Sequence, residues 1–438
     1  MEKELYKNKY ADRREVKAKI TSIVVKNGVV EEVVDNWEHA LSYRVVNNSM
    51  GFASTNHPGS QGIWRNAVKL SKTGTCKRNL SEEKIVKDEK KIKCKFNPRD
   101  IPVEEKIKIT LQIDKELRVS DKISTTDVLY HDAWVEKGFE NTEGTSIIQK
   151  YPLVAIHATA VSREGGMIQR AVEGFAGHFG LERISSFKPE KIGIRAVEML
   201  KSETIKGGKY DVVVDGKMAG VLAHEAVGHA CEADSVLDGD SILEGMLGKR
   251  IGNRIVSIAD DATKTSWKGG YFYDDEGVKG QKKYLVKEGV LAGYLHSRET
   301  GFQMNSKSTG NYRGDVLHLP LVRMSNTYFE KGEHTKEELF EISKGIYLGG
   351  MLGGAVITKT GEFIFTAEEG FLIEKGEKTK RLRNLMLVGN ILQTLKQIDG
   401  IGRDFLTSPG TCGKQGKPCP VADGGPHLRI RKIFVSGK

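Results

Sequence analysis

Runs of β-branched residues and amphipathic segments alternate along the first half of the chain. The Asn27-Gly28 pair lies between two β-branched runs and predicts a β-hairpin, because this dipeptide favours the tight turn between antiparallel strands. Other segments are typical of helices, the first of them directly after the breaker Asn56-His57-Pro58-Gly59. We expect helices over 61–71, 103–118 and 189–201, and further strands over 123–135, 144–149 and 153–161. The pattern predicts an α+β fold that begins with an N-terminal α/β region of mixed strands and helices.

The character of the sequence changes near residues 202–210, which are polar and contain glycine. A strand, "YDVVVD", follows, and later glycines alternate with β-branched runs such as "GGAVITKTGEFIFTAEEGFLIEKGE". This pattern is typical of tightly turned antiparallel strands, and predicts a strand-rich, barrel- or roll-like C-terminal domain. We expect an N-terminal domain over 1–205, with subregions 1–75 and 76–205, a C-terminal domain over 206–438, and a linker or exposed element over 80–96.

Length and composition limit the class of protein. At 438 residues the chain exceeds the usual size of one hydrophobic core, which favours more than one domain. It has no apolar run of about eighteen residues, the length that a transmembrane helix needs. Its charged N-terminus lacks the apolar core of a signal peptide. We therefore expect a cytoplasmic protein that does not span a membrane.

Net charge and cysteine content argue against a nucleic-acid-binding protein and against a disulfide-rich protein. The formal charge is +10, from 68 basic and 58 acidic residues, but the lysines are interleaved with glutamates, as in "SEEKIVKDEKKIKCK". We interpret the charge as a solvated surface and do not expect nucleic acid as the main partner. Five cysteines are too few for a disulfide framework and are more typical of buried thiols with one metal ligand. They are Cys76, Cys94, Cys231, Cys412 and Cys419.

One apolar segment, "AGVLAHEAVGHACEADS", carries His224, Glu225 and His229. Zinc proteases with the H-E-x-x-H pattern have histidines four residues apart, whereas these are five apart. On a regular helix, at about 100° per residue, the two imidazoles would point about 140° apart. A single π-type turn of about 4.4 residues would align them, and Gly228 would ease that distortion. The alternative is a pair of hydrogen-bonded histidines on a buried helix.

The chemistry of these residues favours the metal site. Neutral imidazoles are good zinc ligands, and catalytic zinc has three protein ligands and one open position. Glu225 lies beside the first histidine and could act as the general base for a water whose pKa the ion lowers toward about 7. Alternatively, Glu225 could be an ordinary residue of the helix surface without a catalytic role, although its neighbours in the sequence look buried.

Several stretches, in this order, resemble successive blocks of the TldD/PmbA family of zinc metallopeptidases. They are "RVVNNSMGFASTN", "LAHEAVGHACEADS", "YDDEGVKGQKKYLVKEGVLAGYLHSRETG", "TGNYRGDVLHLPLVRMSNTY" and "SPGTCGKQGKPCPVADGGPHLRI". The resemblance covers nearly the whole chain, is weakest over about 75–150, and is most specific in the second half. Because His224, Glu225 and His229 are all present, the chain resembles the catalytic, TldD-like members and not the PmbA-like members that lack the motif.

The resemblance implies that Cys412, in "PGTCGKQG", is the third zinc ligand. A thiolate is a strong zinc ligand, and Gly410 and Gly413 would let the backbone approach a crowded site; a small turn residue is the alternative. Cys419 stands where the family usually has an aliphatic residue, and could be another ligand or a buried thiol. Cys231, two residues after His229, should point away from the ion.

Other polar residues of the family-like blocks could contact substrate. Asn311, Tyr312 and Arg313 could donate hydrogen bonds to a developing oxyanion, or could be turn residues. The family usually has a second basic residue at the position of Gly314, which puts any role of that position in doubt. His427, in "GGPHLRI", is expected to have a structural or substrate-lining role.

Together these features predict a zinc-dependent peptidase that cleaves unstructured or partly degraded peptides and pro-peptides with broad sequence specificity. A strand-rich domain could hold the substrate as an added strand through main-chain hydrogen bonds. The resemblance also implies a dimer, either with a second copy or with a PmbA/TldE-like subunit. Two alternatives remain: a binding or assembly protein with a purely structural zinc, and a hydrolase in which Cys412 is the nucleophile.

Overall fold

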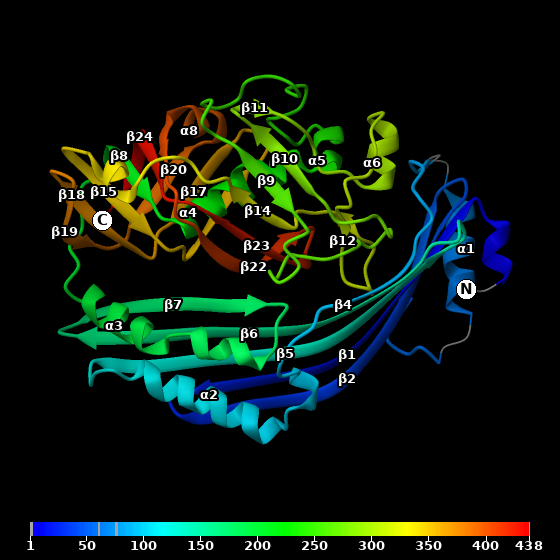
Figure 1. Ribbon diagram of the computed structural model, residues 1–438, viewed down its shortest axis with the longest axis horizontal. Coiled ribbons are helices and arrows are strands. Elements are labelled where there is room, and N and C mark those ends of the chain that lie inside the picture. Colours follow the sequence, from blue (N-terminus) through cyan, green and yellow to red (C-terminus); the bar gives the residue numbers. More distant parts are fainter. Residues whose placement is uncertain (1–2, 60–61, 75–77, 438) are drawn as a thin grey trace.

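The structure is a computed structural model that describes residues 3–59, 62–74 and 78–437, so that Cys76 lies outside the described residues. A long, curved N-terminal sheet forms one layer, and the C-terminal domain packs against it as a second layer (Figure 1). Two of the helices, α2 and α3, cover the face of the long sheet that is turned away from the C-terminal domain. Among the described helices, none is both long and apolar enough to cross a bilayer.

Seven strands form the N-terminal sheet, with the order β3-β2-β1-β5-β6-β4 and with β7 also paired to β6. Their bounds are β1 Tyr10–Lys26, β2 Val29–Val46, β3 Met50–Thr55, β4 Lys87–Lys91, β5 Ile123–Asn141, β6 Ser146–Glu164 and β7 Met167–Gly177. The predicted hairpin joins β1 and β2, and both turn residues, Asn27 and Gly28, have positive φ angles of 51° and 77°. Such angles at both central positions are those of the type I′ turn.

The three predicted N-terminal helices are present as α1 Ile63–Thr73, α2 Val103–Leu117 and α3 Pro189–Met199. Leu117 of α2 and Ile192 of α3 are buried against β-strand residues such as Tyr130 and Ile156. One expectation needs correction. The strands expected over 144–149 and 153–161 form one continuous strand, β6, which begins at Ser146. The charged segment 80–96, expected as a linker or exposed element, contains the short strand β4, which pairs in parallel with β6 and has no buried residue.

Two large sheets and one strand pair make up the C-terminal domain. The six-stranded sheet has the order β11-β10-β9-β14-β23-β22, and the nine-stranded sheet the order β16-β17-β20-β24-β8-β15-β18-β19, with β21 paired to β24. The bounds in the first are β9 Ile258–Asp261, β10 Lys282–Lys287, β11 Val290–Leu291, β14 Asn326–Phe329, β22 Leu406–Lys414 and β23 Lys417–Gly425. Those in the second are β8 Gly208–Val214, β15 Lys344–Gly349, β16 Gly353–Ile357, β17 Glu362–Thr366, β18 Glu369–Glu374, β19 Glu377–Leu382, β20 Met386–Asn390, β21 Ile398–Ile401 and β24 Leu428–Ser436. The pair is β12 Tyr312–Arg313 and β13 Leu321–Val322.

The α+β class is confirmed, but within the described residues no sheet closes into a barrel. A helical segment that begins with α4 Gly216–Val221 contacts strands of both large sheets and fills the space between them. The largest hydrophobic core includes residues of this segment and of both sheets. The remaining α-helices are α5 Ala233–Leu237, α6 Arg298–Gln303, α7 Lys336–Phe340 and α8 Ile391–Gln397, and short 3₁₀ helices span Lys3–Lys7, Pro98–Asp100 and Leu181–Ser186.

Candidate metal centre

The two histidines lie where the buried helical segment changes its winding. Asp215 caps α4 by accepting a hydrogen bond from the backbone N–H of Met218 at 2.8 Å. The chain then forms a π-helical turn over Leu222–Gly228 and a 3₁₀ turn over His229–Cys231. The backbone N–H of His229 donates to the carbonyl oxygen of His224, five residues earlier. The predicted π turn is therefore confirmed, and it accommodates the extra residue between the histidines.

The reason for glycine at position 228 differs from the one expected. Gly228 has ordinary helical angles, φ −58° and ψ −55°, so the turn does not require its conformational freedom. A Cβ atom there would lie 1.9 Å from the sulfur of Met324. The glycine lets the helical segment pack closely against Met324, which is itself fully buried.

A hairpin from the end of the chain brings Cys412 to these histidines. Strands β22 and β23 are joined through Gln415 and Gly416, which both have positive φ angles. The Sγ atom of Cys412 lies 3.2 Å from Nε2 of His229. The potential ligand atoms of His224, His229 and Cys412 all lie within 4.8 Å of one another. Gly413 is not needed for a close approach, because a Cβ atom there would meet nothing within 4 Å.

Burial and mutual charge set the protonation of these groups. Burial raises the pKa of Cys412, but hydrogen bonds and charges from His224 and His229 outweigh that effect and lower the pKa to about 5. Burial lowers the pKa of both histidines, whereas Cys412 raises that of His224, and Glu232 with Cys412 raises that of His229. The sulfur is therefore a thiolate at neutral pH, which is the form that binds metals.

Glu225 lies on the solvent-accessible side of the His224, His229 and Cys412 cluster. Its side chain is 31% exposed, and its Oε2 atom lies 3.8 Å from Nε2 of His229. By contrast, His224 is only 3% exposed, and its Nδ1 atom is buried without a hydrogen-bond partner among the described residues. A carboxylate next to the ligands, yet open to solvent, can exchange protons with a substrate or a water at the same place.

Comparison with known proteins identifies the family. Models of the PmbA/TldA metallopeptidase domain 1, central domain and C-terminal domain match residues 11–71, 96–202 and 207–437. A protein named metalloprotease, from Methanothermobacter thermautotrophicus, is 39% identical over 437 residues, which cover 98% of this chain and 95% of that protein. The chain belongs to the PmbA/TldD family.

Other relatives agree with this assignment to the PmbA/TldD family. A protein from Saccharolobus solfataricus, named zinc metalloprotease TldD homolog, is 31% identical over 328 residues, or 72% of each chain. The crystal structure of TldE from Thermococcus kodakarensis has a TM-score of 0.80 and 18% identity, and covers 99% of this chain and 98% of that one. The latter likeness shows the fold alone.

The sequence analysis missed two acidic residues that interact with the His224, His229 and Cys412 cluster. Glu232 accepts a hydrogen bond from Nδ1 of His229 at 3.1 Å and is 1% exposed. Burial raises the pKa of Asp423 to about 7, opposed by His224 and reinforced by Glu225 and Cys412. Only the position of Glu232, three residues after His229, could have suggested its role. No sequence signal points to Asp423.

The residues expected to donate to an oxyanion have other partners. Asn311 donates to Oδ1 of Asp260 at 3.1 Å and to the carbonyl oxygen of Arg323 at 2.9 Å. The ring of Tyr312 lies beneath the guanidinium of Arg44. The guanidinium of Arg313 donates to the carbonyl oxygens of Met324 and Pro420. These contacts favour the structural alternative for the three residues.

The other predicted candidates are not members of the His224, His229 and Cys412 cluster. His427 stacks on Tyr347, and its Nδ1 atom lies 2.6 Å from Oδ2 of Asp404. Cys231 is fully buried in the largest core. Cys419 is paired across the hairpin with Cys412 but offers no ligand atom to the cluster.

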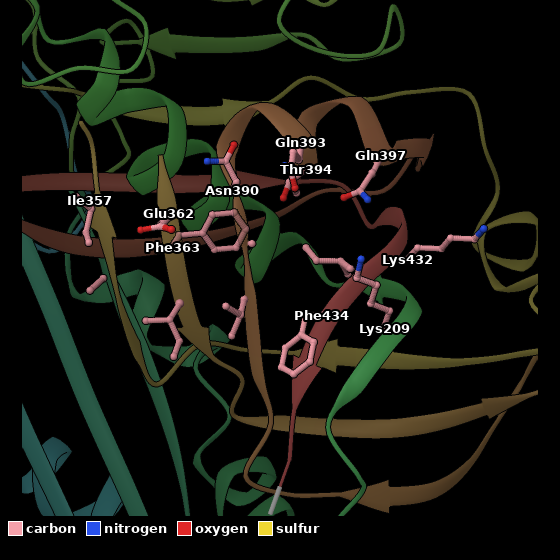
Figure 2. A pocket seen from close by; sticks show the side chains of 15 residues that line it. Lys209, Ile357, Glu362, Phe363, Asn390, Gln393, Thr394, Gln397, Lys432 and Phe434 are labelled. Atoms are coloured by element: carbon pink, nitrogen blue, oxygen red, sulfur yellow. The ribbon is translucent and has the colours of Figure 1, made fainter. Parts of the chain in front are cut away.

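None of the three candidate ligands lines a pocket described here. One pocket, of about 630 Å³, lies on the nine-stranded sheet beside α8, with Phe363, Asn390 and Phe434 among its lining residues (Figure 2). A second, of about 340 Å³, lies between the N-terminal sheet and the C-terminal domain and includes Cys419 and Arg313. Within the described residues, the one group of side chains found that could hold a metal ion lies between the helical segment 222–231 and the β22–β23 hairpin.

Proposed function

We propose that this protein is a zinc-dependent peptidase whose ion is held by His224, His229 and Cys412. The single observation that supports this most is the convergence of the three ligand atoms within 4.8 Å, from elements far apart in the sequence. Imidazole nitrogens and thiolate sulfurs are both zinc ligands, and three protein ligands with one open position are typical of catalytic zinc. The buried Nδ1 atom of His224, which has no hydrogen-bond partner among the described residues, also fits a site that a bound ion would organise.

When bound there, zinc would supply a Lewis acid that polarises a peptide carbonyl and makes water more acidic. The protein supplies the proton transfers. Glu225, with Oε2 3.8 Å from Nε2 of His229 and with its side chain partly exposed, would take the proton of the attacking water and deliver it to the leaving amine. Neither histidine is available for that task, because both are nearly buried and face Cys412.

The substrate class follows from the strand that carries Cys412. Strand β22 is the last strand of its sheet, so one of its edges is not paired with another described strand. An extended peptide could add to this edge through main-chain hydrogen bonds, which read little sequence. We therefore propose unstructured peptides, cleaved with broad specificity, as substrates. We also propose a dimeric assembly, with a second copy or with a TldE-like subunit, and a place in the cytoplasm; membership of the PmbA/TldD family supports the dimer.

A second candidate is a hydrolase with Cys412 as nucleophile, because its sulfur lies 3.2 Å from a histidine nitrogen and its pKa is lowered to about 5. Metal content and cleavage of an unfolded peptide, measured on the same samples, separate the candidates. The peptidase requires that a chelator abolish cleavage and that Glu225→Gln keep zinc while kcat falls by about 10²–10⁴-fold. Activity that survives the chelator but not thiol alkylation would identify the cysteine hydrolase. Full activity of Glu225→Gln would indicate that zinc, if bound, is structural.

A further inference from the structure

Glu232 holds the imidazole of His229 on the side away from Cys412. Nδ1 of His229 lies 3.1 Å from Oε2 of Glu232, whereas its Nε2 lies 3.2 Å from the sulfur of Cys412. Glu232 follows the 3₁₀ turn His229–Cys231 directly and is 1% exposed. A carboxylate that accepts the Nδ1 hydrogen fixes the tautomer in which Nε2 carries the lone pair. That nitrogen is the one turned toward the other ligand.

The same carboxylate also reaches the strand that carries Cys412. Lys414 lies two residues after Cys412 on β22, so both side chains point to the same face of the strand. Nζ of Lys414 lies 3.0 Å from Oε2 of Glu232 and donates to Oδ1 of Asp234 at 2.7 Å. Glu232 therefore joins the helical segment to the hairpin through a buried ion pair.

Arg323 fixes the backbone of the hairpin beside this carboxylate. Its guanidinium donates to the carbonyl oxygens of Cys412 at 2.6 Å and of Lys417 at 2.9 Å, one on each strand. Its Nε atom lies 4.0 Å from Oε1 of Glu232, and both side chains are 1% exposed. Glu232 is thus the one carboxylate, among those described here, that faces His229, Lys414 and Arg323 together.

We propose that Glu232 is a positioning residue of the metal centre, which orients His229 and holds the strand of Cys412 at the separation at which one ion can bind both. This inference rests on the proposed function in requiring that the cluster bind a metal. If Glu232 only stabilised the fold, the ion pair with Lys414 would be enough and the bond to His229 would not be needed. The bond to Nδ1 of a candidate ligand is the feature that assigns the carboxylate to the metal centre.

Asp234 provides a matched control for this role. It also accepts a hydrogen bond from Lys414, but it has no contact with either histidine among the described interactions. The substitution Asp234→Asn therefore removes a charge from the same lysine and leaves the bond between Glu232 and His229 in place. Glu232→Gln instead keeps the side-chain shape but removes the charge that faces Nδ1.

The experiment measures zinc affinity by competition with a chromophoric chelator, together with the absorption spectrum of the cobalt-loaded protein and thermal unfolding of the metal-free protein. We expect Glu232→Gln to weaken zinc binding by about 10–100-fold and to change the absorption spectrum of the cobalt-loaded protein. Asp234→Asn should change the affinity by less than about fivefold. The proposal would be overturned if Glu232→Gln bound zinc with wild-type affinity and showed an unchanged cobalt spectrum. It would also be overturned if the metal-free variant were less stable than wild type but bound zinc equally well.

Further variants keep the outcome decisive. If Glu232→Gln does not fold, Lys414→Gln takes its place: weaker zinc binding supports the proposal, and wild-type affinity overturns it. Wild-type protein that binds zinc but cleaves no peptide would contradict the proposed function and leave the role of Glu232 intact. Wild-type protein that binds neither zinc nor cobalt would overturn both.

Discussion

The sulfur of Cys412 lies 3.2 Å from Nε2 of His229, although 183 positions separate the two residues in the chain. Cys412 belongs to the edge strand β22, and His229 begins the 3₁₀ turn that directly follows the π-helical turn. The pKa of Cys412 is lowered and the pKa values of His224 and His229 are raised, so a bound zinc ion would compete with protons for these atoms. The fold thus brings the three proposed ligands together from elements far apart in the chain.

The first prediction concerns the ionisation of Cys412 in metal-free protein. With its pKa lowered to about 5, Cys412 should be a thiolate at pH 7 and should become protonated only as the pH falls through about 5. Burial raises the pKa of Cys231 and Cys419, so these thiols should remain protonated at pH 7. Thiolate absorbance near 240 nm, recorded against pH for wild type minus Cys412→Ser, measures the midpoint. A midpoint near that of a free thiol, about 8.5, would contradict the prediction.

The second prediction concerns the packing of α4 on the hairpin. A Cβ atom at Gly220 would lie 2.3 Å from the backbone nitrogen of Gly424, and a backbone cannot move aside as a side chain can. We expect Gly220→Ala to lower the free energy of unfolding by about 1–3 kcal/mol and to weaken zinc binding, because the two ligand-bearing elements are pushed apart. Gly413→Ala, which meets nothing within 4 Å, is the matched control and should be close to wild type in chemical denaturation. Equal stability of the two variants would show that the close approach is unimportant.

The sequence allowed the histidine turn to be predicted, because the spacing of His224 and His229 is a local property of one segment. The sequence could not reveal the ion pair between Glu232 and Lys414, because Lys414 belongs to a strand near the other end of the chain. The glycines that alternate with β-branched runs correctly indicated a strand-rich C-terminal domain, but its described sheets do not close into a barrel. At Gly220 glycine permits helix α4 to touch the backbone of strand β23, a tertiary requirement that composition does not reveal.

The third prediction tests the edge of β22 as the place where substrate adds as a strand. In a paired strand, alternate backbone N–H groups face the neighbouring strand. Two peptide substrates are compared, one N-methylated at its odd-numbered amides and one at its even-numbered amides. KM should rise for the peptide whose methylated amides face β22, and should not rise for the other. Each lost main-chain hydrogen bond should raise KM by about 2–10-fold. Peptides of scrambled sequence, without N-methyl groups, should be cleaved at similar rates. Equal effects of methylation in both registers would rule out strand addition.

The fourth prediction concerns stability at low pH. His178 is buried, its Nδ1 atom donates to the carbonyl oxygen of Thr265 at 2.9 Å, and its ring lies against Tyr151. Burial, together with the positive charges of Arg313, Lys137 and Lys268, lowers the pKa of His178 to about 4, although the bond to Thr265 opposes the shift. Between pH 6.5 and 4 the unfolded chain therefore binds a proton at this site that the folded chain excludes.

This difference destabilises the folded protein progressively as the pH falls from about 6.5 to about 4, and has no effect at higher pH. The loss between pH 7 and pH 4.5 should be about 2 kcal/mol. Because other groups titrate in the same range, the measurement is the difference between wild type and His178→Gln in urea denaturation of metal-free protein at the two pH values. The glutamine variant keeps a donor for Thr265 but cannot bind a proton, so it should lose less stability than wild type. An equal loss in both proteins would mean that His178 is not the group that resists protonation.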